Sequence, residues 1–244
     1  MPAVLTESID QIFVITLNRP DARNAWNDAL VEGLREAWVS FEKSDDRVCV
    51  VRANGPHFSS GLDLKAPPKE GISAFPNLFV KSKKPIIAAV EGKVLGVAGG
   101  FVMMCDMVFA GRDATFAYLE ARVGYFKGVM GGFSGRLQHE AGLQWIMTGD
   151  TIDADRAREI GLINEVTKTG EAFNRSMEVA RRIADNAPLV IQTMKALAQA
   201  TVPKGPVEIF YEYEQMLSAI KDSEDGKEGL VAMREKRKPK FRGR

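Results

Sequence analysis

The sequence is poor in the residues that build metal sites and disulfide frameworks. Its 244 residues include only two cysteines and two histidines. Cys49 and Cys105 both stand within apolar runs, which is typical of buried, reduced thiols and leads us to expect a cytoplasmic protein. His57 and His139 have no further ligand at a metal-binding spacing, so we predict no metal site.

Long apolar runs and long blocks of like charge are also missing. No apolar run reaches the roughly 18 to 20 residues that span a bilayer, and residues Met1 to Asp10 show no signal peptide. The formal net charge is +1, and the one basic block is the tail around Lys236. These features argue against a membrane protein and against a nucleic-acid-binding surface. An apolar content of 45% is ordinary for a single globular domain.

The order of the apolar segments predicts an α/β fold. A helix with its cap at Asn27 or Asp28 is expected after the first of five predicted strands, and Asp153 is expected to cap a later helix. The predicted strands are Ile12–Leu17, Val48–Arg52, Ile86–Val90, Met107–Ala110 and Leu162–Val166. Their alternation with helices argues for parallel pairing through crossover helices. The pattern becomes helical late in the chain, which predicts an α/β core over residues 1–170 and a C-terminal helical region over residues 171–244.

A glycine-rich turn lies between the strand Ile86–Val90 and an apolar helix expected to begin near Phe101. It contains four glycines, Gly92, Gly96, Gly99 and Gly100. Glycines let a ligand approach the backbone, and a helix start presents unpaired N–H groups that stabilise an oxyanion. Glycines in this spacing serve equally well for tight packing of a helix on a strand. Spacing alone leaves both interpretations open.

Residues 66–83 interrupt the α/β pattern. Pro67, Pro68 and Gly71 disfavour a helix, whereas the apolar residues from Phe75 to Val80 are suited to covering a pocket.

Two segments resemble the crotonase (enoyl-CoA hydratase/isomerase) superfamily. They are F-S-S-G-x-D-L-K at residues 58–65 and K-P-I-I-A-A-V-x-G at residues 84–92, and the resemblance extends over nearly the whole chain. It implies a crotonase-like spiral of ββα units with a C-terminal helical region that forms a homotrimer or a dimer of trimers. It also implies an acyl-CoA thioester substrate and no separate cofactor, since coenzyme A is part of the substrate.

The same resemblance implies how the substrate is activated. By motif alignment, the backbone N–H groups of Leu62 and Val97 donate hydrogen bonds to the thioester carbonyl and stabilise the enolate charge. Val97 stands where the family commonly has glycine.

The acid–base residues distinguish the possible reactions. Family hydratases use two glutamates; the first position is Gly100 here, and the second is Glu120. A single carboxylate resembles the enoyl-CoA isomerases, which move one proton between two carbons, and this is the leading interpretation. An enoyl-CoA hydratase is also compatible with the sequence, as is a hydratase-lyase that uses tyrosines such as Tyr118 and Tyr125. A non-catalytic acyl-CoA-binding subunit and a merely surface-exposed Glu120 also remain open.

Coenzyme A contacts follow from the resemblance as well. It places coenzyme A near the backbone around Ala22 and Arg23, with Lys65 near the phosphates. The basic tail of a neighbouring subunit is expected to reach the nucleotide. The candidate residues are Ala22, Arg23, Asp63, Leu64, Lys65 and Lys236. Asp63 is expected mainly to order its own loop, and a solvated tail is the alternative for Lys236.

The C-terminal helices carry an apolar stripe that favours burial against another subunit. Its members are Met177, Ile183, Ile191, Met194 and Leu197.

Overall fold

The computed structural model describes residues 1–78, 81–124, 135–206, 209–210, 213, 217, 219–220 and 222–243. Contacts between residues divide the chain into two compact units, Met1–Gly205 and Pro206–Arg244. Helix α6 (Ala172–Ala184), at the start of the expected helical region, lies in the first unit and packs on the strands of the main sheet.

The main sheet has six strands in the order β1-β2-β3-β4-β6-β9. Strand β1 pairs with β2 antiparallel, and all the other neighbours in this sheet are parallel, as the strand–helix alternation predicted. The strands are β1 (Val4–Ile9), β2 (Ile12–Leu17), β3 (Val48–Ala53), β4 (Ile86–Val90), β6 (Met107–Gly111) and β9 (Glu165–Thr167). Strand β1 was not predicted, because its side chains are mostly exposed and carry no apolar alternation.

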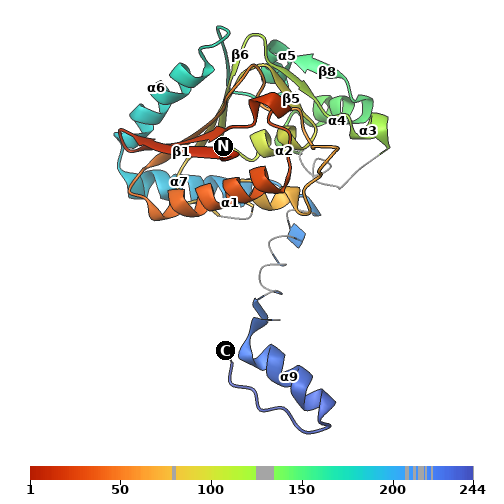
Figure 1. Cartoon of the computed structure of the whole chain (residues 1–244). Coiled ribbons are helices and arrows are strands. Elements are labelled where there is room, and N and C mark those ends of the chain that lie inside the picture. Colours follow the sequence, from red (N-terminus) through yellow and green to blue (C-terminus); the bar gives the residue numbers. More distant parts are fainter. Residues whose placement is uncertain are drawn as a thin grey trace. The chain divides into compact units, whose positions relative to one another are not determined.

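Helices cover the two faces of this sheet. Ile12 and Val14 of β2 belong to a buried cluster with residues of α6 (Ala172–Ala184), whereas Phe13 stacks on Phe41 of α1 (Asp28–Lys43) with ring centroids 5.5 Å apart. Successive side chains of a strand point to opposite faces, so α1 and α6 lie on opposite sides of the sheet (Figure 1). Asn27 caps α1 as expected, since its side chain accepts a 3.0 Å hydrogen bond from the Leu30 N–H.

A second sheet of three strands carries the turns that matter for the site. Its order is β5-β7-β8, with β5 parallel to β7 and β8 antiparallel to β7. The chain passes from β4 through β5 into α2, and then from β6 through β7 into α3, so the expected succession of ββα units is confirmed. These elements are β5 (Lys93–Leu95), β7 (Thr115–Ala117), β8 (Thr151–Asp153), α2 (Val97–Met103) and α3 (Glu120–Val123).

Helix α2 begins at Val97, earlier than the expected start near Phe101. Gly96 is the residue before the helix and has φ +52° and ψ −122°, a conformation that favours glycine. Gly99 and Gly100 are buried inside the helix, so they allow close packing rather than ending the helix.

The remaining elements of the first unit pack around these sheets. They are η1 (Pro20–Ala22), η2 (Gly71–Ala74), α4 (His139–Thr148), α5 (Ala154–Glu159) and α7 (Pro188–Thr201). The apolar segment after Pro68 is largely buried, and the Trp38 indole donates a 2.8 Å hydrogen bond to the Ala74 carbonyl there. Asp153 caps α5 as expected, accepting a 2.8 Å bond from the Arg156 N–H. Within the described residues, no helix is long and apolar enough to cross a bilayer.

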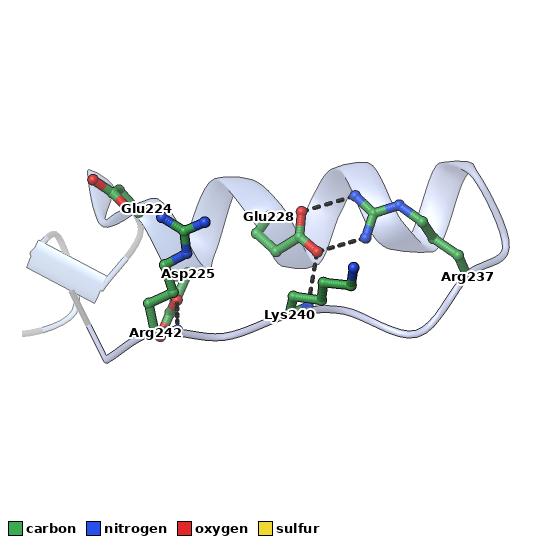
Figure 2. A pocket seen from close by; sticks show the side chains of 6 residues that line it. All are labelled: Glu224, Asp225, Glu228, Arg237, Lys240 and Arg242. Atoms are coloured by element: carbon green, nitrogen blue, oxygen red, sulfur yellow. Dashed lines mark hydrogen bonds and ion pairs between the residues drawn. The ribbon is translucent and has the colours of Figure 1, made fainter.

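The second unit contains α9 (Glu224–Arg234) and the basic tail, which folds back along the helix (Figure 2). Both guanidinium ends of Arg237 reach Glu228, at 2.6 and 2.8 Å, and the Arg242 N–H donates a 2.6 Å bond to Asp225. The sequence pattern also predicts a helix from Val207 to Ile220, but most of this range lies outside the described residues.

Candidate active site

The two glycine-containing segments of the sequence lie side by side. The Ser59 N–H donates to the Lys93 carbonyl at 3.0 Å, and the Leu95 N–H donates to the Ser59 carbonyl at 3.1 Å. A Cβ atom on Gly61 would lie 2.8 Å from the Leu95 carbonyl oxygen, so only glycine fits there without displacement. The loop that follows β3 therefore packs directly on the strand that leads into α2.

The Leu62 N–H is directed away from the segment with which Leu62 pairs. Trp26 and Leu62 form a parallel bridge, in which the Trp26 N–H donates to the Gly61 carbonyl at 2.8 Å and the Asp63 N–H donates to the Trp26 carbonyl at 2.9 Å. In such a bridge the flanking residues supply the bonds, and the N–H of the central residue points to the other side. Leu62 therefore presents its donor on the side opposite Trp26.

The Val97 N–H belongs to the first residue of α2. The first N–H groups of a helix have no partner within the helix. The preceding residue, Gly96, is fixed because its N–H donates a 2.9 Å bond to the Ala117 carbonyl at the end of β7. The structure thus places the Leu62 and Val97 N–H groups on two adjacent segments of the chain.

The Glu120 carboxyl lies against the start of α2. Its Oε1 atom is 3.2 Å from the position that a Cβ atom would take on Gly96. Its Oε2 atom is buried and has no hydrogen-bond partner among the described residues. Burial raises the pKa of Glu120 from 4.5 to about 7. Glu120 is therefore half-buried at the candidate site rather than an ordinary surface glutamate.

Gly100 lies one helical turn beyond Gly96 and is buried. Residues that are four apart share a helix face, so neither Gly96 nor Gly100 places a side chain between α2 and Glu120. Tyr118 is also buried, two positions before Glu120, with 4% of its surface exposed. Tyr125 lies outside the described residues.

The candidate coenzyme A residues fall into two groups. Arg23, at the end of η1, accepts a 2.9 Å bond from the Ser60 N–H through its carbonyl oxygen, so Ala22 and Arg23 adjoin the loop that carries Leu62. Leu64 and Lys65, after this loop, are both exposed, Leu64 by 88%. Lys236 belongs to the second unit, just after α9.

Asp63 orders its own loop, as expected, and has a charged partner that the sequence did not reveal. Its Oδ1 atom accepts a 3.2 Å bond from the Lys65 N–H, and its Oδ2 atom lies 3.1 Å from Nη2 of Arg19. The hydrogen bond from Arg19 lowers the pKa of Asp63. The Arg19 guanidinium also bonds the Ala25 carbonyl. It therefore links the loop after β2 to the loop that follows β3.

Candidate metal ligands do not gather in the ranges that the structure describes: no three His, Cys, Asp or Glu side chains converge there. His57 has structural contacts instead, since its Nδ1 accepts from the Lys93 N–H at 3.4 Å and its carbonyl accepts from Asn24 at 3.0 Å. The described site therefore combines backbone N–H donors with the half-buried carboxyl group of Glu120.

Comparisons with known proteins indicate the family to which the chain belongs. The family model for enoyl-CoA hydratase/isomerase matches residues 7–244. The chain is 29% identical to 2,3-dehydroadipyl-CoA hydratase from Escherichia coli over 257 residues, covering 100% of both proteins. It is 32% identical to enoyl-CoA hydratase EchA19 from Mycobacterium tuberculosis, covering 100% of this chain and 97% of that protein.

Solved structures give the same result. A carnitinyl-CoA dehydratase from Mycobacterium avium superimposes with a TM-score of 0.78 at 32% identity, and a probable enoyl-CoA hydratase/isomerase from Mycobacterium abscessus with a TM-score of 0.76 at 35% identity. Both comparisons cover 100% of this chain and 100% of the other. With its ββα architecture and its match to the family along almost the whole sequence, the chain belongs to the enoyl-CoA hydratase/isomerase family of the crotonase superfamily.

Proposed function

We propose that this acyl-CoA hydratase/isomerase family member is an enoyl-CoA isomerase that uses Glu120 as its single acid–base residue. The observation that carries the proposal is the position of the Glu120 carboxyl beside Gly96, at the start of α2, with glycine at position 100. One carboxyl group is enough to move a proton between two carbons of an acyl chain.

In the proposed reaction, the thioester carbonyl accepts hydrogen bonds from the Leu62 and Val97 N–H groups. Glu120 removes a proton from the α carbon of a 3-enoyl-CoA, and the electron pair of that C–H bond is delocalised into an enolate. The two donors stabilise the enolate oxygen by roughly 3 kcal/mol each. Glu120 then returns the proton to the γ carbon as the double bond moves to the 2,3 position, which leaves the carboxylate ready for the next turnover.

The acidity of Glu120 supports this role. A residue that first accepts and then donates a proton works best when its pKa lies near the operating pH. Burial raises the pKa of Glu120 to about 7, which meets this condition. The neighbouring Tyr118 is a second candidate for proton donation, and Tyr125 is a further candidate from the sequence alone.

Coenzyme A binding is assigned to the loops next to the two donors. The backbone at Ala22 and Arg23 adjoins the loop that carries Leu62, and the Asp63–Lys65 segment follows Leu62 directly, so both are proposed to contact the nucleotide. Lys236 is proposed to contact the phosphates of a substrate in a neighbouring subunit. Arg237 is less available for this role, because Glu228 and Glu235 both form ion pairs with it.

Hydration is the second candidate function, because the relatives from Escherichia coli and Mycobacterium tuberculosis are both named hydratases. A hydratase must add the hydroxyl group of a water molecule at the β carbon and a proton at the α carbon. Family hydratases divide this work between two glutamates, whereas this chain has Gly100 at the first position. Hydratase-lyase activity and acyl-CoA binding without turnover are two further candidates, and the substrate screen described next distinguishes them.

The test is a screen of 2-enoyl-, 3-enoyl- and aromatic acyl-CoA thioesters, scored separately for hydration, isomerisation and cleavage. We expect isomerisation of a 3-enoyl-CoA, and we expect Glu120→Gln to abolish it while the dissociation constant for coenzyme A stays nearly the same. Glu140→Gln is the matched control, since Glu140 is an exposed glutamate in the first turn of α4. Fast hydration of crotonyl-CoA without any isomerisation would contradict the proposal and favour the hydratase.

A further inference from the structure

Arg122 contacts both sides of the turn that precedes β8. Its Nε donates a 3.1 Å hydrogen bond to the Thr148 carbonyl, and its Nη2 lies 2.6 Å from Oδ1 of Asp150. The two contacts fall on either side of Gly149, where a Cβ atom would lie 3.0 Å from Cγ of Arg122. The side chain of Arg122 therefore lies flat across this turn.

The turn itself is anchored in the protein interior. Trp145 of α4 has 4% of its surface exposed, and its indole N–H donates a 3.0 Å bond to the Asp150 carbonyl. The Gly149 N–H donates to the Trp145 carbonyl at 3.1 Å, which closes the end of α4. Arg122 thus attaches α3 to a turn whose backbone is held by Trp145.

Glu120 lies inside a closed loop that this contact completes. The register pairs Ala117 of β7 with Thr151 of β8, so the chain leaves β7 beside Asp150. The chain then continues through Glu120 to Arg122, whose side chain forms the ion pair with Asp150. This ion pair closes a loop of chain that contains Glu120. At the same edge of the sheet, the Gly96 N–H donates to the Ala117 carbonyl and so fixes the start of α2.

The short helix α3 depends on such a contact. It spans only Glu120–Val123, and a helix of one turn is not stable without tertiary interactions. An isolated surface ion pair contributes little to stability, but Arg122 combines a short charge-assisted contact with a second bond to a helix C-terminal carbonyl. Its main effect is therefore expected on the geometry of α3 rather than on global stability.

We propose that Arg122 is a positioning residue that, through Asp150 and the Thr148 carbonyl, holds the Glu120 carboxyl against Gly96 at the start of α2. This inference rests on the proposed function only where it assigns proton transfer to Glu120. The placement of the Glu120 carboxyl is an independent claim and has a readout that does not require turnover.

The experiment compares Arg122→Met, Arg122→Lys and Asp150→Asn with the matched control Arg112→Met. Arg112 forms a similarly exposed ion pair with Asp155, at 2.8 Å, on another part of the surface. For the first and third variants we expect kcat to fall roughly tenfold, with KM changed less than about twofold, because misplacing a catalytic group lowers kcat more than binding. Lysine keeps the charge but provides one point contact in place of two, so Arg122→Lys should recover only part of kcat.

The second readout is the titration of the Glu120 carboxyl by 13C NMR, with its signal assigned from the Glu120→Gln spectrum. We expect Arg122→Met and Asp150→Asn to lower the titration midpoint, because a released carboxyl becomes more hydrated. Unchanged kcat and unchanged midpoint in these variants, or equal effects of Arg112→Met, would overturn the positioning role. If Arg122→Met fails to fold, Asp150→Asn carries the same test.

The two proposals fail in different ways. Full activity of Glu120→Gln would contradict the proposed acid–base role, whereas the NMR midpoint would still report whether Arg122 holds the carboxyl in place. A shifted midpoint without loss of kcat would overturn the functional part of the inference.

Discussion

Arg19 and Asp63 form an ion pair, with 3.1 Å between Nη2 and Oδ2. Asp63 directly follows Leu62, whose N–H is proposed to bind the thioester oxygen. The same carboxylate accepts a bond from the Lys65 N–H, so one side chain connects Arg19 to the end of this loop. The pair is largely shielded, with side-chain exposures of 21% for Arg19 and 16% for Asp63. It therefore restrains the loop that carries Leu62.

Asp63→Asn is expected to lower both kcat/KM and thermal stability at neutral pH. The Arg19 hydrogen bond lowers the pKa of Asp63 below its value in the unfolded chain. The pair therefore contributes stability above the unfolded pKa, and the contribution is lost as the pH falls through the folded pKa. Melting temperatures of wild type and variant should differ at pH 7 and converge in acid. Glu7→Gln, which removes the more exposed pair with Arg52, serves as the control.

Gly96→Ala should lower kcat by much more than its loss of unfolding free energy would explain. Alanine would be strained at φ +52°, and its Cβ would lie 3.2 Å from the Glu120 carboxyl. Gly161→Ala is the matched control, since Gly161 has φ +85° and no atom within 4 Å of the added Cβ. Both variants should lose about 1 to 3 kcal/mol of unfolding free energy, but only Gly96→Ala should lose kcat, by roughly a hundredfold. Equal kcat values for the two variants would show that Gly96 has no special role at the active site.

The raised pKa of Glu120 predicts two pH profiles. Since the base must be ionised, kcat/KM should rise with pH and level off above a pKa of about 7. Stability should change in the opposite direction, because the folded state binds the proton more tightly than the unfolded state between the ordinary value of 4.5 and about 7. Unfolding free energy should thus decrease across this range by about 1 to 2 kcal/mol, after allowance for solvent screening. Chemical denaturation of wild type and Glu120→Gln at several pH values measures this difference.

The exposed apolar surface of α7 predicts self-association. Met194 and Leu197 are 60% and 66% exposed, and Leu189 on the same helix is 76% exposed. Met177 and Ile183, which the sequence analysis grouped with this stripe, belong to α6 and pack against the core. The exposed apolar surface is therefore smaller than expected. Light scattering should detect a trimer or hexamer at micromolar concentration, and Leu197→Glu should weaken it. A strict monomer for the wild type would contradict this prediction.

The parts of the fold that follow local rules were predictable from the sequence. Strand β2 has the predicted bounds, and Asn27 and Asp153 cap their helices as expected, because buried apolar runs and caps are encoded by neighbouring residues. Strand β1 was missed because an exposed edge strand carries no such pattern.

The site divides in the same way. Leu62, Val97 and Glu120 are predicted from motifs, and their segments lie next to one another in the structure. Arg19 and Arg122 were not identified, because each acts through a partner far away in the sequence and no local pattern indicates such a pairing. A buried charge at Lys195 was missed for the same reason; it lies 2.7 Å from Asp106 and attaches α7 to the core.

Gly100→Glu tests directly whether one or two carboxylates determine the reaction. Gly100 is buried one turn beyond Gly96, and a helical side chain extends over the turn that precedes its own Cα. A glutamate introduced there would therefore extend toward the part of α2 that Glu120 contacts. Two carboxyl groups close together cannot both ionise easily, so the variant should also raise the pKa of Glu120.

The expected outcome is a change in the ratio of two activities. A second carboxyl group allows one group to activate water while the other exchanges a proton with the α carbon, so hydration should increase relative to isomerisation. Gly100→Gln is the matched control, because glutamine has nearly the same size and helix propensity as glutamate but no titrating group. If both variants lose all turnover but still fold, added volume at this position blocks the substrate. Gly100→Glu could instead leave the ratio of hydration to isomerisation unchanged while Gly100→Gln remains active. A second carboxyl group at position 100 would then not determine which of the two reactions occurs.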